Sequence, residues 1–453
     1  MLKPSPDCGG LFMLYHAYEV NHAALAPWRE IVGASKRYLE SPLNPASYTW
    51  AGRTMAAACD LFEVATRRYE KPEWGLYKTD VNGETVDVST RVIWEQPFCR
   101  LLHFQRDSSQ MCAAYDNKKW ADPRVLLVAP LSGHYATLLR RTVDAFLPDH
   151  EVYVTDWADA REVPLSKGRF DFNDYIDYIM AMFELLGPDT HVIGICQPGP
   201  PVLAAIAVMS AENNEFLPAS MTFMGSPIDT RQSPTLPNNV ALERSYGWFR
   251  DNMIYSVPWP NKGFMRRVYP GFLQLSGFIT MNQERHVMAH RNYFEHLVEG
   301  DCDSVHKHRE FYDEYLAVLD LTEEFYLQTI RVVFQDHCLA KGTLRHRGHL
   351  VDPATITKVA LMTVEGEKDD ISGIGQTQAA HTLCPNIPQS MQTDYVQPGV
   401  GHYGVFSGSR FRNEIQPRIA EFIRAHFNRS EELAFKKENP LLFFAPHESG
   451  EHV

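Results

Sequence analysis

The sequence is poor in several features that would assign it to a well-known class of protein. It holds 8 cysteines in 453 residues, with no Cys-x-x-Cys pair, which indicates reduced thiols rather than a disulfide framework. No apolar run approaches the length of about 20 residues that a membrane-spanning helix needs. Gly-x-Gly-x-x-Gly and Walker-type loops are also missing, so the sequence implies no nucleotide cofactor.

Positive charge is scarce as well. Lys and Arg number 43 against 56 Asp and Glu, a formal net charge of −13, which argues against nucleic acid as a main partner. The first residues lack a charged segment followed by an apolar one, so we read no signal peptide and expect a cytoplasmic protein. The hydrophobic share of 44% and the charged share of 22% are ordinary for a globular chain.

Strand and helix patterns alternate along most of the chain. The run 124–129 is apolar at every position after Arg124, as expected for a strand buried on both faces of a parallel sheet. We expect strands over 84–94, 97–106, 124–129, 150–155, 191–195, 220–224, 358–365 and 390–396, with helices over 137–147, 173–186, 376–383 and 411–427. This order predicts an α/β protein with a mostly parallel, doubly wound sheet.

The alternation stops between Pro227 and Asp352, where the chain is helical and rich in aromatic residues. We expect this insertion to cover the carboxyl edge of the sheet as a lid. The predicted organisation is a helical lead-in over 1–82, a core over 83–226 and 353–427, the lid over 227–352, and a tail over 428–453. We expect Leu441–Phe444 in the tail to pack on the body.

One strand end carries a reactive side chain. The strand 191–195 runs directly into Cys196, Gln197 and Pro198, and a small-residue helix follows. This is how a nucleophile elbow reads, although the usual Gly-x-nucleophile-x-Gly pattern has Pro198 in its fifth place. A helix N-terminus at that point favours a thiolate, which is the nucleophilic form of cysteine.

A cysteine nucleophile needs a base and an orienting carboxylate, which follow it in the order acid and then histidine in α/β-hydrolases. Asp369 and Asp370 follow the strand 358–365, and His402 follows the strand 390–396. The order therefore predicts a triad of Cys196, an aspartate and His402. We favour Asp369 as the acid and keep Asp370 as the alternative.

An oxyanion hole would complete such a site. One donor is expected to be the backbone N–H of Gln197, the residue after the nucleophile. The other should come from the loop 130–135 after a buried strand, where Ser132 is our choice. His286 and His290 are spaced four residues apart, but no third ligand accompanies them, so we predict no metal site.

Three longer stretches resemble the intracellular poly(3-hydroxybutyrate) depolymerases: Met13–Trp28, Val152–Pro164 and Val364–Gly373. The resemblance runs from about Met13 to Phe427. It implies an α/β-hydrolase fold and a Cys–Asp–His triad that hydrolyses the storage polyester on cytoplasmic granules. Carried over by position, the family's nucleophile falls on Cys196, its acid on Asp369 and its base on His402.

The expected function is therefore hydrolysis of amorphous poly(3-hydroxybutyrate) through an acyl-cysteine, with polymer and oligomers as partners and a homodimer as one assembly. Three alternatives stay open. A polyhydroxyalkanoate synthase would pass the acyl chain to a hydroxyl, an acyl-CoA thioesterase would release small acids, and an inactive relative would only bind granules. The sequence leaves open chain-length preference and whether water or a thiol resolves the acyl-enzyme.

Overall fold

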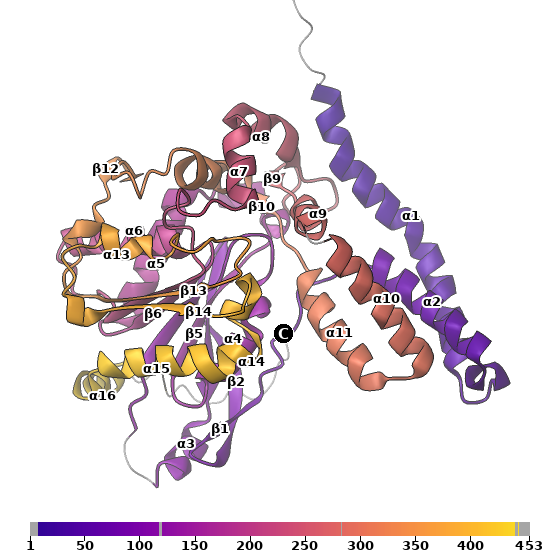
Figure 1. The fold of residues 1–453 in the computed structure, drawn as a ribbon, viewed down its shortest axis with the longest axis horizontal. Helices are drawn as coiled ribbons and strands as arrows, with labels where there is room; N and C mark the ends of the chain where they lie inside the picture. Colours follow the sequence, from indigo (N-terminus) through magenta and orange to yellow (C-terminus); the bar gives the residue numbers. More distant parts are fainter. Residues whose placement is uncertain (1–7, 117–119, 282, 440–442, 444–453) are drawn as a thin grey trace, which may run out of the picture.

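A nine-stranded sheet forms the centre of the protein (Figure 1). The computed structural model describes residues 8–116, 120–281, 283–439 and 443. The strand order is β1-β2-β3-β5-β4-β6-β7-β13-β14. The strands are β1 (Lys78–Val81), β2 (Glu84–Gln96), β3 (Cys99–Arg106), β4 (Arg124–Val128), β5 (Glu151–Trp157), β6 (His191–Ile195), β7 (Ser220–Met224), β13 (Ala360–Gly366) and β14 (Gln392–Gln397).

The direction of the strands identifies the fold. β1, β2, β3 and β5 pair antiparallel at one edge, and every pairing from β5 to β14 is parallel. β4 lies between β5 and β6, so the chain reverses its direction of travel across the sheet there. From β2 onward this is the strand order of the α/β-hydrolase fold, and the predicted fold class is confirmed. Each predicted strand is present, with ends within about three residues.

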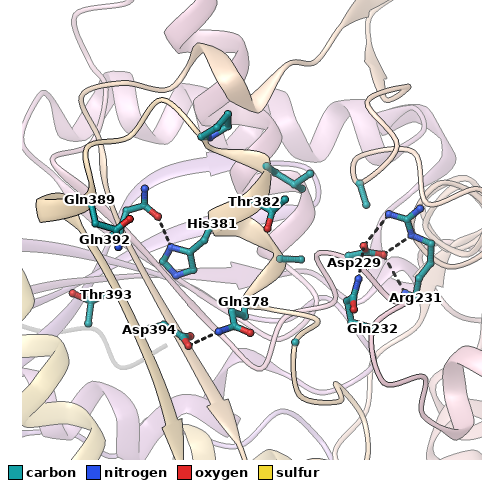
Figure 2. Close-up of a pocket in the computed structure, with 15 residues that line it drawn as sticks. Asp229, Arg231, Gln232, Gln378, His381, Thr382, Gln389, Gln392, Thr393 and Asp394 are labelled. Atoms are coloured by element: carbon teal, nitrogen blue, oxygen red, sulfur yellow. Dashed lines mark hydrogen bonds and ion pairs between the residues drawn. The ribbon is translucent and has the colours of Figure 1, made fainter.

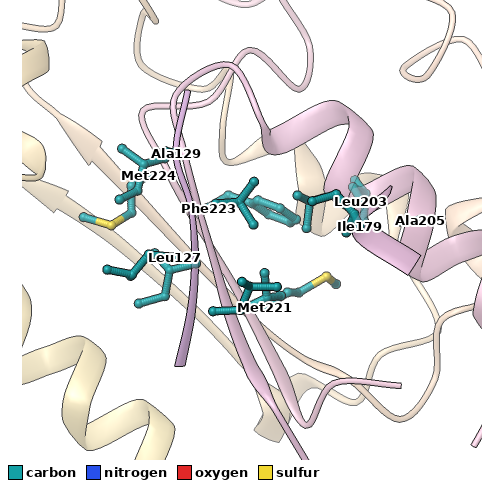
Figure 3. Packing of buried hydrophobic residues seen from close by; sticks show 14 of the residues in the cluster. Leu127, Ala129, Ile179, Leu203, Ala205, Met221, Phe223 and Met224 are labelled. Carbon is teal, nitrogen blue, oxygen red and sulfur yellow. The ribbon is translucent and has the colours of Figure 1, made fainter. Parts of the chain in front are cut away.

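Helices cover both faces of this sheet. In Figure 1, α5 (Phe172–Leu186), α6 (Gly199–Ala211) and α13 (Ala379–Leu383) lie on one face, and α4 (Arg140–Phe146) and α15 (Gln416–Ala425) lie on the other. The residues of α6 are buried on nearly every side of the helix, which explains its unbroken apolar sequence. Figure 3 shows Leu203 and Ala205 of α6 close to Phe223 of β7 in this core.

The segment between β7 and β13 is more than a helical lid. It holds α7 (Leu236–Glu243), α8 (Tyr246–Met253), α9 (Gly271–Met281), α10 (Gln283–Glu299), α11 (Cys302–Tyr315) and α12 (Glu323–Thr329). A small antiparallel sheet, in the order β10-β9-β8, also belongs to it: β8 (Tyr255–Ser256), β9 (Arg267–Tyr269) and β10 (Leu321–Thr322). A hairpin follows, of β11 (Arg345–His346) and β12 (His349–Leu350).

Two helices of this segment join the N-terminal helices in a helical arm, which we define as α1 (Cys8–Glu40), α2 (Trp50–Thr66), α10 and α11. The arm extends from the side of the hydrolase body (Figure 1). α10 packs against both α2 and α11. Asp60 of α2 lies at the centre of this contact, bonded to Lys36, Tyr293 and Arg309. Segments expected to be separate thus form one structural unit.

Membrane-spanning helices, cysteines and the C-terminal segment were also subjects of prediction. No helix among the described residues is long and apolar enough to cross a membrane. The cysteines whose side chains the structure describes form no disulfide with one another. Helix α16 (Arg429–Glu438) follows the core, and most of the predicted stretch Leu441–Phe444 lies outside the described residues. Phe443 is described: its side chain is buried, and its carbonyl accepts a hydrogen bond from Gln105 at 2.7 Å.

Candidate active site

Cys196 sits on the sharp turn between β6 and α6. Its φ of +66° lies in the left-handed region, which a cysteine adopts only where its surroundings impose it. Its N–H donates to the carbonyl of Met224 at 2.8 Å, and its carbonyl accepts from the N–H of Gly199 at 3.2 Å. These two bonds hold the turn, and the thiol remains partly exposed at the edge of the sheet.

The fifth position of the motif holds Pro198, and the glycine expected there comes one residue later, at Gly199. Pro198 precedes α6 in the right-handed helical region, where no intrahelical N–H is required. Gly199 takes over the close contact: a Cβ atom there would lie 2.5 Å from Cβ of Ser226. The close approach between strand and helix therefore depends on Gly199.

Asp369 and His402 face each other across the ends of β13 and β14. Nδ1 of His402 lies 2.8 Å from Oδ2 of Asp369. The other oxygen, Oδ1, accepts hydrogen bonds from the N–H groups of Ile371 and Ser372 at 2.9 and 2.8 Å. The carboxylate is fully buried, whereas the neighbouring Asp370 is exposed. Of the two predicted acids, only Asp369 contacts the histidine.

Cys196 is the second neighbour of His402. Burial lowers the pKa of His402, but the charges of Cys196 and Asp369, and hydrogen bonds to both, outweigh it and hold that pKa well above its ordinary value. Because Asp369 binds Nδ1, the ring has Nε2 free for the thiol. A raised imidazole pKa favours the imidazolium, which is the state left after the ring takes the thiol's proton.

Gly225 is a site residue that the sequence reading missed. It follows β7 with a φ of +54°, and a Cβ atom there would lie 3.2 Å from both Oδ2 of Asp369 and Cε1 of His402. Any side chain would therefore press on the Asp369–His402 pair. The available signal was a glycine at the end of a buried strand, the same signal that marks turns of many other kinds.

The side chain of Gln197 reaches the loop after β4. Its Oε1 accepts the N–H of Leu131 at 3.1 Å, while its Nε2 has no hydrogen-bond partner among the described residues. The predicted donor Ser132 is partly exposed in the same loop. The structure thus brings the two expected oxyanion donors, Gln197 and Ser132, onto adjoining loops, and it ties those loops together through a side chain.

Aromatic residues of the insertion cover this edge of the sheet. Tyr315 at the end of α11 faces Tyr403, with ring centroids 6.0 Å apart. His134 of the β4 loop stacks on Phe278 of α9, with centroids 5.5 Å apart. Burial lowers the pKa of His134 to about 4, so its ring is neutral. These contacts bring α9 and α11 against the segments that follow β4 and β14.

A polar pocket lies away from the predicted site residues. It has a volume of about 800 Å³ and is lined by polar side chains, among them Asp229, Gln378, His381 and Asp394 (Figure 2). Gln378 donates to Asp394 at 2.7 Å. This pocket borders the beginning of β14, whereas His402 follows its end, and none of the predicted site residues lines it.

The histidines weighed as metal ligands make other contacts. Nδ1 of His286 lies 2.9 Å from the hydroxyl of Tyr312, and the ring of His290 lies 5.3 Å from that of His308. Among the residues that the structure describes, no three His, Cys, Asp or Glu side chains are grouped so that they could hold a metal ion.

The family model and the curated relative that match this chain are both named for polyester metabolism. Residues 225–427 match the family model described as "PHB de-polymerase C-terminus". A curated relative, the poly(3-hydroxyalkanoate) polymerase subunit PhaC of Haloarcula marismortui, is 22% identical over 417 residues, which cover 88% of this chain and 80% of the relative. One match is named for breaking down a polyester and the other for making one.

Two lipases are among the similar solved structures. A monoacylglycerol lipase from Paleococcus ferrophilus is 13% identical, with a TM-score of 0.39 over 68% of this chain and 98% of the lipase. A soluble variant of monoglyceride lipase from Saccharomyces cerevisiae is 13% identical, with a TM-score of 0.42 over 80% of this chain and 98% of the lipase. The fold assignment rests on the strand order of this chain.

Proposed function

We propose that this protein hydrolyses ester bonds of poly(3-hydroxybutyrate) through a covalent acyl-cysteine, with Cys196 as nucleophile, His402 as base and Asp369 as the orienting acid. The observation that carries the proposal is the 2.8 Å contact between Asp369 and His402 beside a cysteine held at a φ of +66°. This is the triad arrangement of nucleophilic acyl transfer.

In the first half-reaction, Nε2 of His402 takes the proton of the Cys196 thiol while sulfur attacks a polymer ester carbonyl. The oxyanion accepts hydrogen bonds from the N–H of Gln197 and from a donor near Ser132. As the carbon–oxygen bond breaks, the imidazolium protonates the leaving alkoxide, which becomes a hydroxyl chain end. The other part of the chain remains on sulfur as a thioester.

In the second half-reaction, His402 takes a proton from water, and the resulting hydroxide attacks the thioester carbon. The carbon–sulfur bond breaks, a carboxylic acid leaves, and the thiol regains its proton from His402. Asp369 stays ionised throughout and keeps Nδ1 of the ring occupied, so that Nε2 is presented to both partners.

The polyester substrate rests on similarity. The matching family model is described as a depolymerase C-terminus and covers the insertion, β13, β14 and the segments after these two strands, in which Asp369 and His402 lie. On this basis we place the protein at the surface of polyhydroxyalkanoate granules in the cytoplasm, with a homodimer as one arrangement to be tested.

A synthase is the second candidate, because the relative from Haloarcula marismortui is a polymerase subunit. The two reactions share the acyl-cysteine and differ in what enters and leaves. A synthase loads Cys196 from an acyl-CoA thioester and releases the acyl group to the hydroxyl end of a growing chain, whereas a depolymerase loads it from the polymer and releases it to water.

The deciding experiment incubates the purified protein with amorphous poly(3-hydroxybutyrate) granules, with and without CoA, and separately with 3-hydroxybutyryl-CoA. Mass spectrometry identifies the products. We expect free 3-hydroxybutyrate and its oligomers in the absence of CoA. Product formed only as 3-hydroxybutyryl-CoA would identify thiolysis, polymer formed from the CoA thioester would identify the synthase, and release of the free acid from the thioester alone would identify a thioesterase.

Two variants control this experiment. Cys196→Ala should lower the rate by roughly 10³-fold or more, because it removes the nucleophile. Cys338→Ala changes another partly buried cysteine and should leave the rate unchanged. Undiminished depolymerisation by Cys196→Ala would refute the mechanism. Binding of granules without any turnover by the wild type would identify the inactive granule-binding alternative.

A further inference from the structure

A second cavity, of about 520 Å³, lies where the helical arm meets the body. We call it the arm cavity. It is lined by Tyr18 of α1, Leu61 of α2, and Phe272 and Ile279 of α9, and the ring of Tyr18 stacks on that of Phe272 with centroids 4.3 Å apart. None of Cys196, Asp369 and His402 lines it. The arm cavity is therefore separate from the catalytic groups, and most of its walls are apolar.

Three nitrogen atoms on residues that line the arm cavity have no hydrogen-bond partner. They are Nε of Arg67, Nε of Arg161 and Nδ1 of His290, all buried and without a hydrogen bond among the described residues, although Nε of Arg161 lies 3.8 Å from a carboxylate oxygen of Glu162. An arginine Nε–H can only donate. Because burying an unpaired donor is unfavourable, these atoms are suited to a ligand that brings acceptor oxygens into an apolar space.

Each arginine that lines the arm cavity is already paired with a carboxylate, as Arg68 is with Glu19 at 2.7 Å. Arg67 is paired with Asp313, and Arg161 is paired with Asp159 at 2.9 Å. The carboxylate of Asp320 accepts the hydroxyl of Tyr15 at 2.6 Å and the N–H of Gly271 at 2.9 Å. A ligand here meets N–H donors without hydrogen bonds, few free acceptors and no arginine that lacks a carboxylate partner.

From these observations we infer that the arm cavity binds a segment of 3-hydroxyalkanoate polyester chain. Such a chain is uncharged, carries a carbonyl acceptor in every repeat, has no donor except at its end, and is otherwise aliphatic. A peptide would bring N–H donors that find no free acceptor, and a fatty acid would bring a charge and a single acceptor group. The identity of this ligand rests on the proposed function.

One helix connects the arm cavity to the catalytic edge of the sheet. α9 lines the cavity with Phe272 and Ile279, while its Phe278 stacks on His134 of the β4 loop. Gln274 of α9 also packs closely on Gly133 in that loop. A Cβ atom added to Gly133 would lie 2.5 Å from Cδ of Gln274. A chain held in the arm cavity would keep later esters of the same polymer near Cys196, which raises their effective concentration.

The test reduces the volume of the arm cavity by placing a larger side chain on each of two helices that line it. Ile279→Trp fills it from α9, and Leu61→Trp fills it from α2, which has no residue in the catalytic site. Each variant is assayed on amorphous poly(3-hydroxybutyrate) granules and on p-nitrophenyl butyrate, which is too short to reach beyond the catalytic groups. Thr280→Trp, at an exposed position of α9, is the matched control.

On granules, we expect kcat/KM to fall about tenfold in both filling variants because KM rises. With p-nitrophenyl butyrate, we expect their turnover to stay within about twofold of the wild type. The control should match the wild type on both substrates. Arg67→Gln, which removes an unpaired donor together with the Asp313 ion pair, should show a smaller loss with the same selectivity for granules.

Two results would overturn the inference. In one, both filling variants act on granules like the wild type. In the other, both lose activity on the two substrates in equal proportion, which would mean that the cavity is only a gap in the packing of arm and body. A failure of the proposed function is a different result, because the wild type itself would then release no product from granules.

Discussion

The carboxyl edge of the sheet and the helical arm show opposite ways of using polar and apolar groups. At the sheet edge the carboxylate of Asp369 is fully buried and accepts two backbone N–H groups as well as bonding His402. In the arm, aromatic residues face solvent: the side chains of Trp28 and Trp50 are 60% and 70% exposed.

This difference follows from how each region is built. The residues at the sheet edge directly follow strands that are paired along their length, which restricts each side chain to one position. The arm is held by helices from distant parts of the chain that meet through contacts such as Asp60 with Arg309. Rigid geometry suits bond breaking, and an open apolar surface with a cavity suits the binding of a long chain.

The largest effect at the sheet edge is expected when each of the two neighbouring aspartates is replaced by asparagine in turn. Asp369→Asn should lower kcat by about 10³–10⁴-fold, because the amide no longer favours the protonated imidazole or the required tautomer. Asp370→Asn, at an exposed carboxylate, is the matched control and should act like the wild type. Steady-state kinetics on a soluble ester measures both. Equal losses of kcat in the two variants would contradict the assignment of Asp369 as the acid.

Gly225 tests whether the space beneath the triad matters. Gly225→Ala should lower kcat about 10²-fold, because the new Cβ would displace Asp369 or His402 from positions that require sub-ångström accuracy. Gly75→Ala is the matched control: its φ of +62° is similar and nothing lies within 4 Å. Both variants should lose stability from backbone strain, and only the first should lose kcat. Full activity in Gly225→Ala would contradict the close packing.

The link between the elbow and the β4 loop is the third test. Gln197→Met keeps the length of the side chain and removes the acceptor for the N–H of Leu131. We expect kcat to fall about tenfold with little change in KM, because the oxyanion donors would be less well positioned. Gln232→Met, at an exposed glutamine, is the control. An unchanged kcat would mean that the two loops hold their positions independently.

The smallest expected effect concerns the arm. Burial, together with the charges of His290, His296 and Arg309, lowers the pKa of His308 to about 4, and Asp60 opposes this shift weakly. A neutral, half-buried imidazole stabilises the fold above the unfolded pKa of about 6.5, and this stabilisation is lost as pH falls towards about 4, because the unfolded chain binds the proton more readily.

His308→Phe retains the ring that stacks on Tyr293 and Tyr312 and removes the proton site. Between pH 7 and pH 5 the Tm of the wild type should fall by roughly 2 °C more than that of the variant. His306→Phe, on the exposed side of the same helix, serves as control. Equal shifts in the wild type and His308→Phe would mean that this histidine does not couple the arm to pH.

Much of the body could be predicted from sequence because its signals are local. Apolar runs such as Arg124–Val128 and His191–Ile195 are buried along their whole length, and each is followed by a turn and a helix. The order of Cys196, an aspartate and His402 at successive strand ends then predicts which side chains meet, since parallel strands present their carboxyl ends at one edge.

The sequence by itself determined the alternation of strands and helices and the order of the three site residues, because both depend on periodicity and on position along the chain. Only the tertiary structure decided what depends on distance between segments. It separates Asp369 from Asp370 by burial, places Gly225 against the Asp369–His402 pair, and bonds Gln197 to Leu131. It also joins α2 to α10, because their apolar faces do not encode which distant helix will cover them.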